Sequence, residues 1–435
     1  MSFLSSLTRE QKETVGLLQI GTFLEYFDLM LYVHMAVVLN ELFFPKTDPH
    51  TAALLSAFAF CSTYVLRPVG ALIFGYIGDT IGRKPTVIIT TMLMSISCII
   101  MANLPTYAEV GIIAAWLVTI CRIAQGLSSM GEIMGAEIYV TEITKPPVQY
   151  PAVAFIGVSS YLGAVVALAI ASLVTHFAFN WRIAFWIGAC IAVVGSIART
   201  RLRETPEFIK EMHHKKVRLS RDEYIQDKTA RKTFWAYFNI SCGWPLSFYL
   251  AYMYFNPMLQ HKFQYTSGEI ILHNFVLSFV ALISLAALSI ISFKVHPLKI
   301  LKIRGQFFIL LIALTPFIIT HATHHYYIFL LQASVLIVTL ATCPANPIFI
   351  KHIPTLKRFT TVTFIYALSR AVMYVVTSFS LVYLTDFFGY YGLWLIMFPI
   401  TFSFLWGIKH FEKLEEESGT LTMKNDPSPA SFLAA

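Results

Sequence analysis

The stretch YPAVAFIGVSSYLGAVVALAIASLVTHF, residues 150–177, decides the fold of this chain. It runs for 28 residues without a single Asp, Glu, Lys or Arg. A helix needs about 20 predominantly apolar residues to cross the hydrocarbon core of a bilayer. The stretch is therefore predicted to be a transmembrane helix, and similar apolar blocks recur on both sides of it.

The composition of the whole chain agrees with this interpretation. Of its 435 residues, 57% are hydrophobic and 13% are charged, whereas a soluble domain carries roughly 25% charged residues. A multi-pass membrane protein is predicted, and nucleic-acid binding, secretion and soluble enzymology are excluded. The net charge of +8 has an ordinary explanation, because Lys and Arg accumulate on cytoplasmic loops. The six cysteines are scattered singly without metal-ligand or redox spacing, so no metal site and no cofactor are expected.

Apolar blocks separated by charged residues or by Pro, Gly and Asn predict an all-α protein with twelve transmembrane helices. The predicted spans are residues 15–39, 51–77, 86–104, 109–130, 150–177, 182–199, 234–258, 270–292, 305–320, 326–349, 359–385 and 390–409. One long polar stretch separates the sixth span from the seventh. We therefore expect four segments, which are a six-helix bundle over residues 1–198, a cytoplasmic loop over 199–232, a second six-helix bundle over 233–410 and a polar tail over 411–435.

The distribution of positive charge predicts the orientation. With the N-terminus placed in the cytoplasm, 26 of the 32 lysines and arginines fall on cytoplasmic segments. Because positive charge is retained on the cytoplasmic side and the number of spans is even, both termini are expected inside the cell. The central loop is expected to matter for its length and charge, not its order of residues. The predicted location is the cell (inner) membrane.

Several ionisable residues fall well inside predicted spans, where each costs at least about 2.5–3.5 kcal/mol and indicates a functional site. Glu25 and Asp28 are three residues apart, which puts both carboxylates on one face of the first helix. Arg122 lies at a similar depth in the fourth span and can pair with one of them. The remaining carboxylate could then carry a proton. A static ion pair between helices is the alternative, and Glu132, nearer the cytoplasm, is interpreted either way.

Two segments of the first half resemble motifs of a known family. GYIGDTIGRKP, residues 75–85, is similar to the signature loop of the major facilitator superfamily, and RIAQGLSSMGE, residues 122–132, is similar to the motif of its fourth helix. The small glycines permit close helix approach, and the acid can cap a helix start. The resemblance implies a gating role for five residues of the loop, Gly75, Asp79, Gly82, Arg83 and Lys84.

A more specific resemblance extends over residues 20–210. FLEYFD at 23–28 and NWRIAFWIG at 180–188, together with the segments above, resemble the metabolite:proton symporters, with proline/betaine transporters the most similar type. The resemblance implies the major facilitator fold and rocking of two halves about a central site. The second half departs from the family, because SFKVHPLKILKIRG at 292–305 lacks the Asp and the Gly-Arg pair of a second signature loop.

Candidate substrate ligands lie in the seventh, first and eleventh spans. Tyr249, Tyr252 and Asn256 share one helical face, and tyrosine rings can hold a quaternary ammonium group. Tyr26 could join them from the first span. Arg370 lies well inside the eleventh span, and no Asp or Glu falls well inside any span of the second half, so Arg370 is expected to bind the carboxylate of the substrate. Packing or an interfacial girdle is the alternative for the tyrosines, and contact with backbone carbonyls of the tenth span is the alternative for Arg370.

These residues predict a transporter and not an enzyme. The leading hypothesis is a monomeric proton symporter that takes up a small organic zwitterion such as proline or glycine betaine. A proton symporter of a carboxylate, such as a 2-oxo acid, citrate or shikimate, is the alternative within the family. A membrane receptor or osmosensor that does not transport is the alternative from another class. A membrane-embedded enzyme and an ATP-driven pump are disfavoured, because neither a nucleophile–base set nor a phosphate-binding loop is present.

Overall fold

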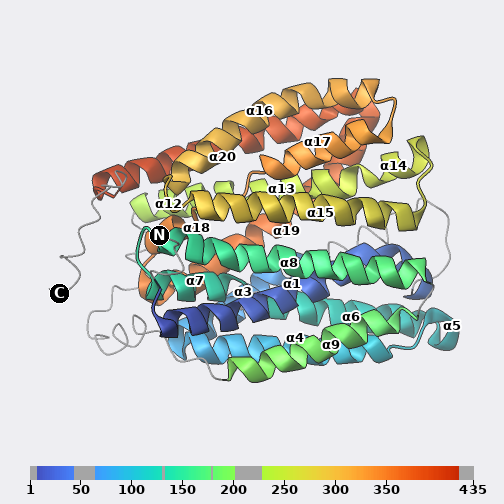
Figure 1. The fold of residues 1–435 in the computed structure, drawn as a ribbon, viewed down its shortest axis with the longest axis horizontal. Helices are drawn as coiled ribbons and strands as arrows, with labels where there is room; N and C mark the ends of the chain where they lie inside the picture. The colour runs from blue at the N-terminus through green and yellow to red at the C-terminus, as the bar shows by residue number, and fades with distance from the viewer. Residues whose placement is uncertain (1–6, 44–63, 130–132, 178–179, 201–227, 421–435) are drawn as a thin grey trace.

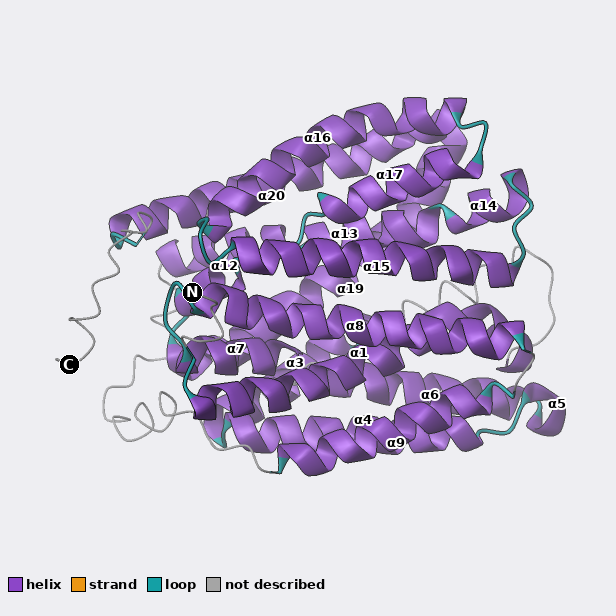
Figure 2. Cartoon of the chain, in the orientation of Figure 1, coloured by secondary structure: helices purple, strands orange, loops and turns teal. Residues whose placement is uncertain are grey.

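The computed structural model describes residues 7–43, 64–129, 133–177, 180–200 and 228–420. Within these ranges the chain is helical and contains no strand (Figure 2), which confirms the all-α prediction. We call the helices up to residue 200 the first half and those from residue 228 the second half. The first half comprises α1 (Arg9–Phe43), α3 (Arg67–Thr80), α4 (Arg83–Asn103), α5 (Tyr107–Val110), α6 (Ile112–Ser128), α7 (Ile133–Ile143), α8 (Gln149–His176) and α9 (Arg182–Arg199).

The second half contains more interruptions than the first. It comprises α12 (Lys228–Ser241), α13 (Gly243–Phe248), the π-helix η3 (Tyr249–Tyr254), α14 (Asn256–Lys262), α15 (Ser267–Ile291), α16 (Pro297–His321), α17 (His325–Ile337), α18 (Asn346–Lys351), α19 (Thr355–Phe388), the 3₁₀ turn η4 (Gly389–Tyr391) and α20 (Gly392–Glu417). Figure 1 shows the two halves as neighbouring layers of roughly aligned helices. They meet where α8 packs on α15 and where α3 packs on α19.

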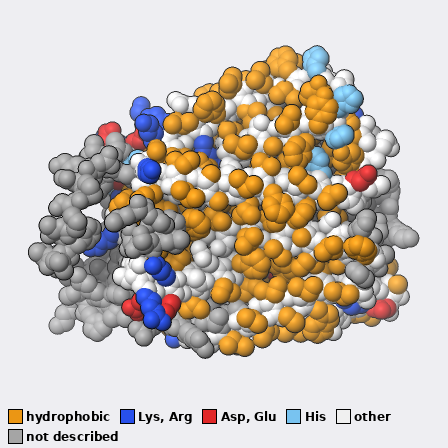
Figure 3. All heavy atoms as spheres, viewed as in Figure 1, with side chains coloured by type: hydrophobic (Ala, Val, Ile, Leu, Met, Phe, Trp, Pro, Cys, Tyr) orange, Lys and Arg blue, Asp and Glu red, His pale blue; other side chains and the backbone are white. Residues whose placement is uncertain are grey.

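The outer surface of the helices is apolar, as a lipid environment requires. Seven of the described helical segments are long and apolar enough to cross a membrane. Large hydrophobic side chains lie fully on the outside, with Trp116 65%, Ile283 67% and Phe387 80% exposed. On the face drawn in Figure 3, hydrophobic side chains cover a broad area, while Lys and Arg gather mainly at one end. We call this the basic end; it holds the start of α1, the turn between α3 and α4, the start of α19 and the end of α20.

The predicted seventh and tenth spans are interrupted near their middle in the structure. Pro245 lies in the seventh, where α13 passes directly into the π-helix η3. In the tenth span, residues 338–345 are non-helical and separate α17 from α18, with Pro344 in the break and Pro347 in the first turn of α18. A proline removes a backbone donor and disfavours a continuous helix. The freed backbone groups are tolerated within the membrane only where protein or a cavity covers them.

Other boundaries differ from the predicted ones by one or two turns. The structure begins α16 at Pro297, whereas the ninth span is predicted from residue 305. It also starts α12 inside the predicted central loop and extends α20 into the predicted tail. Most of that loop and tail, at residues 201–227 and 421–435, lies outside the described residues.

Candidate functional site

A charged cluster lies entirely within the first half. Asp28 of α1 is 3% exposed, and its Oδ1 accepts a hydrogen bond from Cys98 Sγ of α4 at 3.1 Å. Arg122 of α6 is equally buried, with its guanidinium carbon 3.8 Å from the centroid of the Tyr32 ring. Its Nη1 donates to Gln125 Oε1 at 2.7 Å. Asp28 and Arg122 therefore interact electrostatically through a shared buried region, without an ion pair closer than 4 Å between them.

The second candidate acid, Glu25, has a different environment. Its side chain is 2% exposed, and Oε2 accepts the backbone N–H of Ile133 at 3.1 Å. Glu25 thus contacts the start of α7, next to the predicted site residue Glu132, which lies outside the described residues. A second arginine, Arg67, is 1% exposed beside the Tyr64 ring at 4.4 Å. The prediction that these charged residues are buried is therefore confirmed. In the structure, Asp28 and Glu25 have different hydrogen-bond partners.

A central cavity lies between the two halves and has room for water-sized molecules over about 60 Å³. Arg370 of α19 lines it and is 8% exposed. The guanidinium carbon lies 3.3 Å from the centroid of the Tyr366 ring, and Nη1 donates to the Tyr366 carbonyl at 3.3 Å. Tyr26 Oη of α1 is 2.9 Å from Tyr366 Oη, which links the halves across the cavity. Arg370 and Tyr26, predicted from the sequence, thus face the same space.

A carboxylate and an amide line the same cavity near the basic end. Glu137 of α7 is 4% exposed, and its Oε2 accepts a hydrogen bond of 2.7 Å from Asn346 Nδ2 of α18. Asn346 is 5% exposed and is the first residue of α18, directly after the break in the tenth span. This bond joins the two halves. It also fixes the short helix α18 next to the cavity.

Arg304 is a cavity residue that the sequence assigned to a loop. It is 7% exposed in α16, and its Nη1 donates to the Cys343 carbonyl at 3.2 Å, inside the non-helical break. Because α16 begins eight residues earlier than predicted, Arg304 lies two turns inside the helix. The signal that could have found it was Pro297, since proline is favoured in the first turn of a helix. Glu137 and Asn346 gave weaker signals, because Glu137 is an acid between the predicted fourth and fifth spans and Asn346 is a polar residue beside Pro347 in the predicted tenth span.

The predicted tyrosine face of the seventh span is divided by the π-helix. Tyr252 is 4% exposed and lines a smaller apolar cavity together with Tyr26 and Phe248. Neither Tyr249 nor Asn256 is among the residues that line either cavity. Asn256 starts α14, and its Oδ1 accepts from Asn274 Nδ2 at 3.3 Å. The wider turn of a π-helix changes the angle between successive residues, so the 3.6-residue spacing does not hold there.

The signature loop contacts the second half directly. Asp79 Oδ1 accepts the backbone N–H of Phe359 at 3.2 Å, and Oδ2 accepts the backbone N–H and the hydroxyl of Thr360 at 2.9 and 2.7 Å. A Cβ added to Gly75 would lie 2.8 Å from the Cα of Thr360, so this approach requires glycine. Gly82 precedes α4 with a φ of 142°. Of the two basic residues, Arg83 begins α4 and Lys84 follows it.

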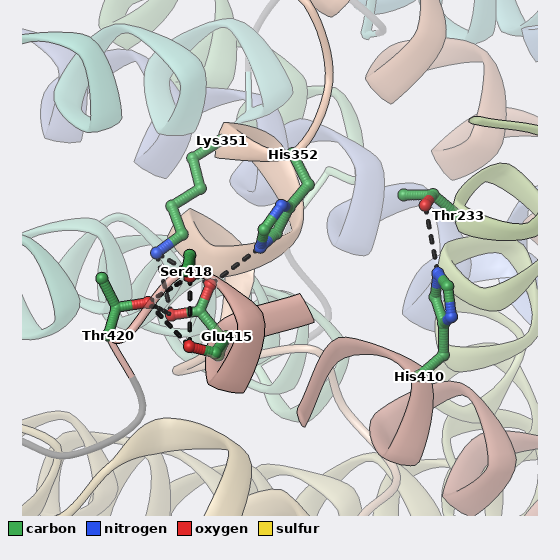
Figure 4. Close-up of polar contacts among 7 residues, drawn as sticks. All are labelled: Thr233, Lys351, His352, His410, Glu415, Ser418 and Thr420. Atoms are coloured by element: carbon green, nitrogen blue, oxygen red, sulfur yellow. Dashed lines mark hydrogen bonds and ion pairs between the residues drawn. The ribbon is translucent and has the colours of Figure 1, made fainter. Parts of the chain in front are cut away.

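The far end of α18 is held by α20 at the basic end (Figure 4). Glu415 has a fully buried side chain and accepts hydrogen bonds from Lys351 Nζ at 2.9 Å and from Thr420 Oγ1 at 2.6 Å. His352 Nε2 lies 2.8 Å from the same carboxylate. Burial lowers the pKa of the nearby His296, which precedes α16. The short helix α18 therefore connects this contact with Asn346 in the cavity.

Comparison with known proteins identifies the family. The profile of the Major Facilitator Superfamily matches residues 18–378, which is most of the chain. The chain belongs to the Major Facilitator Superfamily. It is therefore a multi-pass membrane protein of a transporter family and not an enzyme, as the sequence predicted. The signature loop at 75–85 lies inside the matched region.

Curated relatives of this chain are bacterial transporters. The chain is 35% identical over 209 residues to the inner membrane metabolite transport protein YhjE of Escherichia coli, covering 45% of this chain and 47% of that protein. It is 33% identical over 223 residues to the proline/betaine transporter of Salmonella typhimurium, covering 50% and 44%. The chain thus spans about half the length of the curated relatives it matches.

The solved structures support the fold over nearly the whole chain. The proton:xylose symporter XylE matches with a TM-score of 0.75, covering 93% of this chain and 95% of XylE. The identity is 14%, so the similarity concerns the fold alone. It confirms the predicted major facilitator fold, including the second half, where the sequence motifs are weak.

Proposed function

We propose that this protein is a proton-coupled symporter that takes up a small organic zwitterion such as proline or glycine betaine. The names of its relatives support this class of solute, since they include proline/betaine transporters of two bacteria. Family membership supports alternating access, in which two halves rock about a central site. We propose residues 1–198 and 233–410 as these halves.

The observation that carries the proposal is the composition of the central cavity. Arg370 lines it with one hydrogen bond to a backbone carbonyl and without an ion pair among the described residues. A guanidinium fits a carboxylate through two parallel hydrogen bonds. Glu137 and the ring of Tyr26 line the same cavity. Groups that attract a carboxylate and groups that attract a cation are therefore present together, as a zwitterion requires.

Proton coupling is assigned to the cluster around Asp28. Its Oδ2 is buried and has no hydrogen-bond partner among the described residues, and a carboxylate in this state readily takes up a proton. The buried guanidinium of Arg122 is the charge whose interaction with Asp28 would change when Asp28 takes up a proton. Glu25 is the second candidate, and Glu132 stays a prediction from the sequence.

The proposal is tested in proteoliposomes that contain the purified protein. Labelled proline and glycine betaine are supplied outside, with and without an imposed inward proton gradient. Accumulation above the external concentration that a protonophore abolishes is expected for at least one of the two. Uptake that is the same with and without the proton gradient would contradict proton coupling. Absence of uptake of any zwitterion would contradict the proposed substrate class.

One observation favours a second candidate function, the symport of a small carboxylate. Two arginines, Arg304 and Arg370, line the cavity together with one carboxylate, Glu137. With the three side chains ionised, the cavity carries an excess positive charge, which suits an anion such as a 2-oxo acid, citrate or shikimate. Competition against labelled proline separates the two. Inhibition by such carboxylates at lower concentration than by zwitterions would favour the second candidate.

A further inference from the structure

Two oxygen atoms at the basic side of the central cavity can each accept a further hydrogen bond. The bond between Glu137 and Asn346 uses Oε2 of the carboxylate and Nδ2 of the amide, which leaves Oε1 of Glu137 to accept another donor. Oδ1 of Asn346 is buried and has no hydrogen-bond partner among the described residues. A buried acceptor without a donor is destabilising until a donor reaches it. Both atoms belong to residues that line the cavity.

The two cavity arginines each direct one guanidinium donor to a backbone carbonyl and not to these acceptors. Arg304 donates Nη1 to the Cys343 carbonyl, and Arg370 donates Nη1 to the Tyr366 carbonyl. Neither arginine forms an ion pair with Glu137 within 4 Å in the described part of the chain. The two free acceptors therefore fit a donor brought by the solute.

Several of the aromatic rings near the cavity are already packed against other side chains. The face of Tyr366 is covered by the guanidinium of Arg370 at 3.3 Å. Trp244 packs on Phe248 with ring centroids 4.7 Å apart, and Phe248 packs on Tyr252 at 5.1 Å. Recognition of a quaternary ammonium group depends on several ring faces around one cation. In this cavity, oxygen acceptors are the more available partners for a cationic nitrogen.

We propose that the cavity selects zwitterions whose nitrogen carries N–H groups, with Glu137 and Asn346 accepting hydrogen bonds from that nitrogen. This inference rests on the proposed function and narrows it to primary and secondary amino acids, at the expense of fully methylated betaines. Arg370 binds the carboxylate at the other end of the solute. The positively charged nitrogen of zwitterionic proline carries two N–H groups and can donate to both acceptors at once. A betaine has no N–H group and leaves both unsatisfied.

The test uses three solutes that share one ring and one carboxylate, namely proline, N-methylproline and N,N-dimethylproline. They carry two, one and no N–H groups. Affinity is measured by displacement of labelled proline from the purified wild-type protein in lipid nanodiscs. We expect the affinity to fall at each methylation and at least tenfold over the series. Equal or tighter binding of the dimethylated form would overturn the inference while leaving zwitterion transport intact.

Glu137→Gln is the matching variant, because glutamine keeps the volume and can still accept the bond from Asn346 Nδ2. It removes the negative charge. The affinity for proline is expected to fall at least tenfold and that for the dimethylated form less than twofold. The variant should therefore bind the three solutes with similar affinity. An equal loss for all three solutes would mean that Glu137 acts on the structure alone, and would overturn the inference.

The control is Glu412→Gln, in which the residue is an exposed partner of Lys302 at the basic end. It should bind all three solutes as the wild type does. If the wild type binds none of the three and transports no other zwitterion, the proposed function and this inference fall together. Because the wild-type series needs no variant, a folding defect in Glu137→Gln does not remove the test.

Discussion

The charged cluster around Asp28 and the central cavity around Arg370 each contain a buried arginine against a tyrosine ring, yet they are built differently. The cluster draws Asp28, Cys98 and Arg122 from α1, α4 and α6, all in the first half. The cavity draws residues from both halves, and the bonds Tyr26–Tyr366 and Glu137–Asn346 cross between them. The rocking of the halves that we propose would therefore change the cavity, whereas it would leave the internal geometry of the cluster intact.

This difference suggests that the cluster and the cavity have separate roles in coupling and in solute binding. A group that responds to protons can sit inside one rigid half, because it needs only to change its charge. A group that binds the solute on both sides of the membrane must face the space that opens and closes. Asp28 and Arg122 are absent from the residues that line either described cavity. Variants of the two regions should accordingly separate coupling from binding.

The largest effect is expected for Asp28→Asn. Without an ionisable group at this position, the proton gradient no longer drives uptake, and the accumulation ratio in proteoliposomes falls to about one. Exchange of solute down its own gradient should continue, since the cavity is unchanged. The same measurement on Glu25→Gln decides between the two acids. Normal pH-driven accumulation by Asp28→Asn would contradict the assignment.

The next largest effect is expected for Arg370→Lys. Lysine keeps the charge but loses both the planar contact with Tyr366 and the two-pronged bond to a carboxylate. The apparent affinity for the solute should fall at least tenfold, about 1.4 kcal/mol, with proton coupling retained at saturating solute. Binding measured by displacement of labelled solute gives the result. An unchanged affinity would remove Arg370 from the binding site.

The comparison also shows which features the sequence could predict. Composition and apolar periodicity were sufficient for the all-α membrane fold, because each span must satisfy its own backbone within lipid. Buried charges such as Asp28, Arg122 and Arg370 stood out, because an ionisable residue is rare in an apolar block. These features depend on local sequence alone.

The rest of the site depends on how the helices end and break. Arg304 was missed because the apolar stripe of α16 starts after its first two turns, which are amphipathic and basic. Tyr249 and Tyr252 were placed on one face, since the sequence does not reveal that both lie in a π-helix, where the angle between successive residues differs. The bond between Glu137 and Asn346 joins residues 209 positions apart, and only the packing of the two halves brings them together.

A smaller effect is expected for a substitution at the contact between the halves, outside both the charged cluster and the central cavity. In Gly75→Ala, the new methyl group would lie 2.8 Å from the Cα of Thr360, and the strain is about 1 kcal/mol. Closure at the basic end weakens, so the maximal uptake rate should change roughly fivefold while solute affinity stays within twofold. Thr80→Ala, on the same helix with an exposed hydroxyl bonded to its own backbone, is the control. A rate equal to that of the control would show that this contact does not limit transport.

The smallest effects are expected for the two predicted ligands that lie away from the cavities. Tyr249→Phe and Asn256→Ala should each change solute affinity less than twofold, because neither residue lines the space around Arg370. Tyr252→Ala is the contrasting variant. Its ring lines the apolar cavity next to Tyr26 and Phe248, and its removal should lower affinity about threefold, roughly 0.6 kcal/mol. The three are compared by displacement of labelled solute. A loss at Tyr249 as large as that at Tyr252 would mean that a continuous tyrosine face binds the solute, as the helical spacing in the sequence predicts, and that the π-helix does not divide the site.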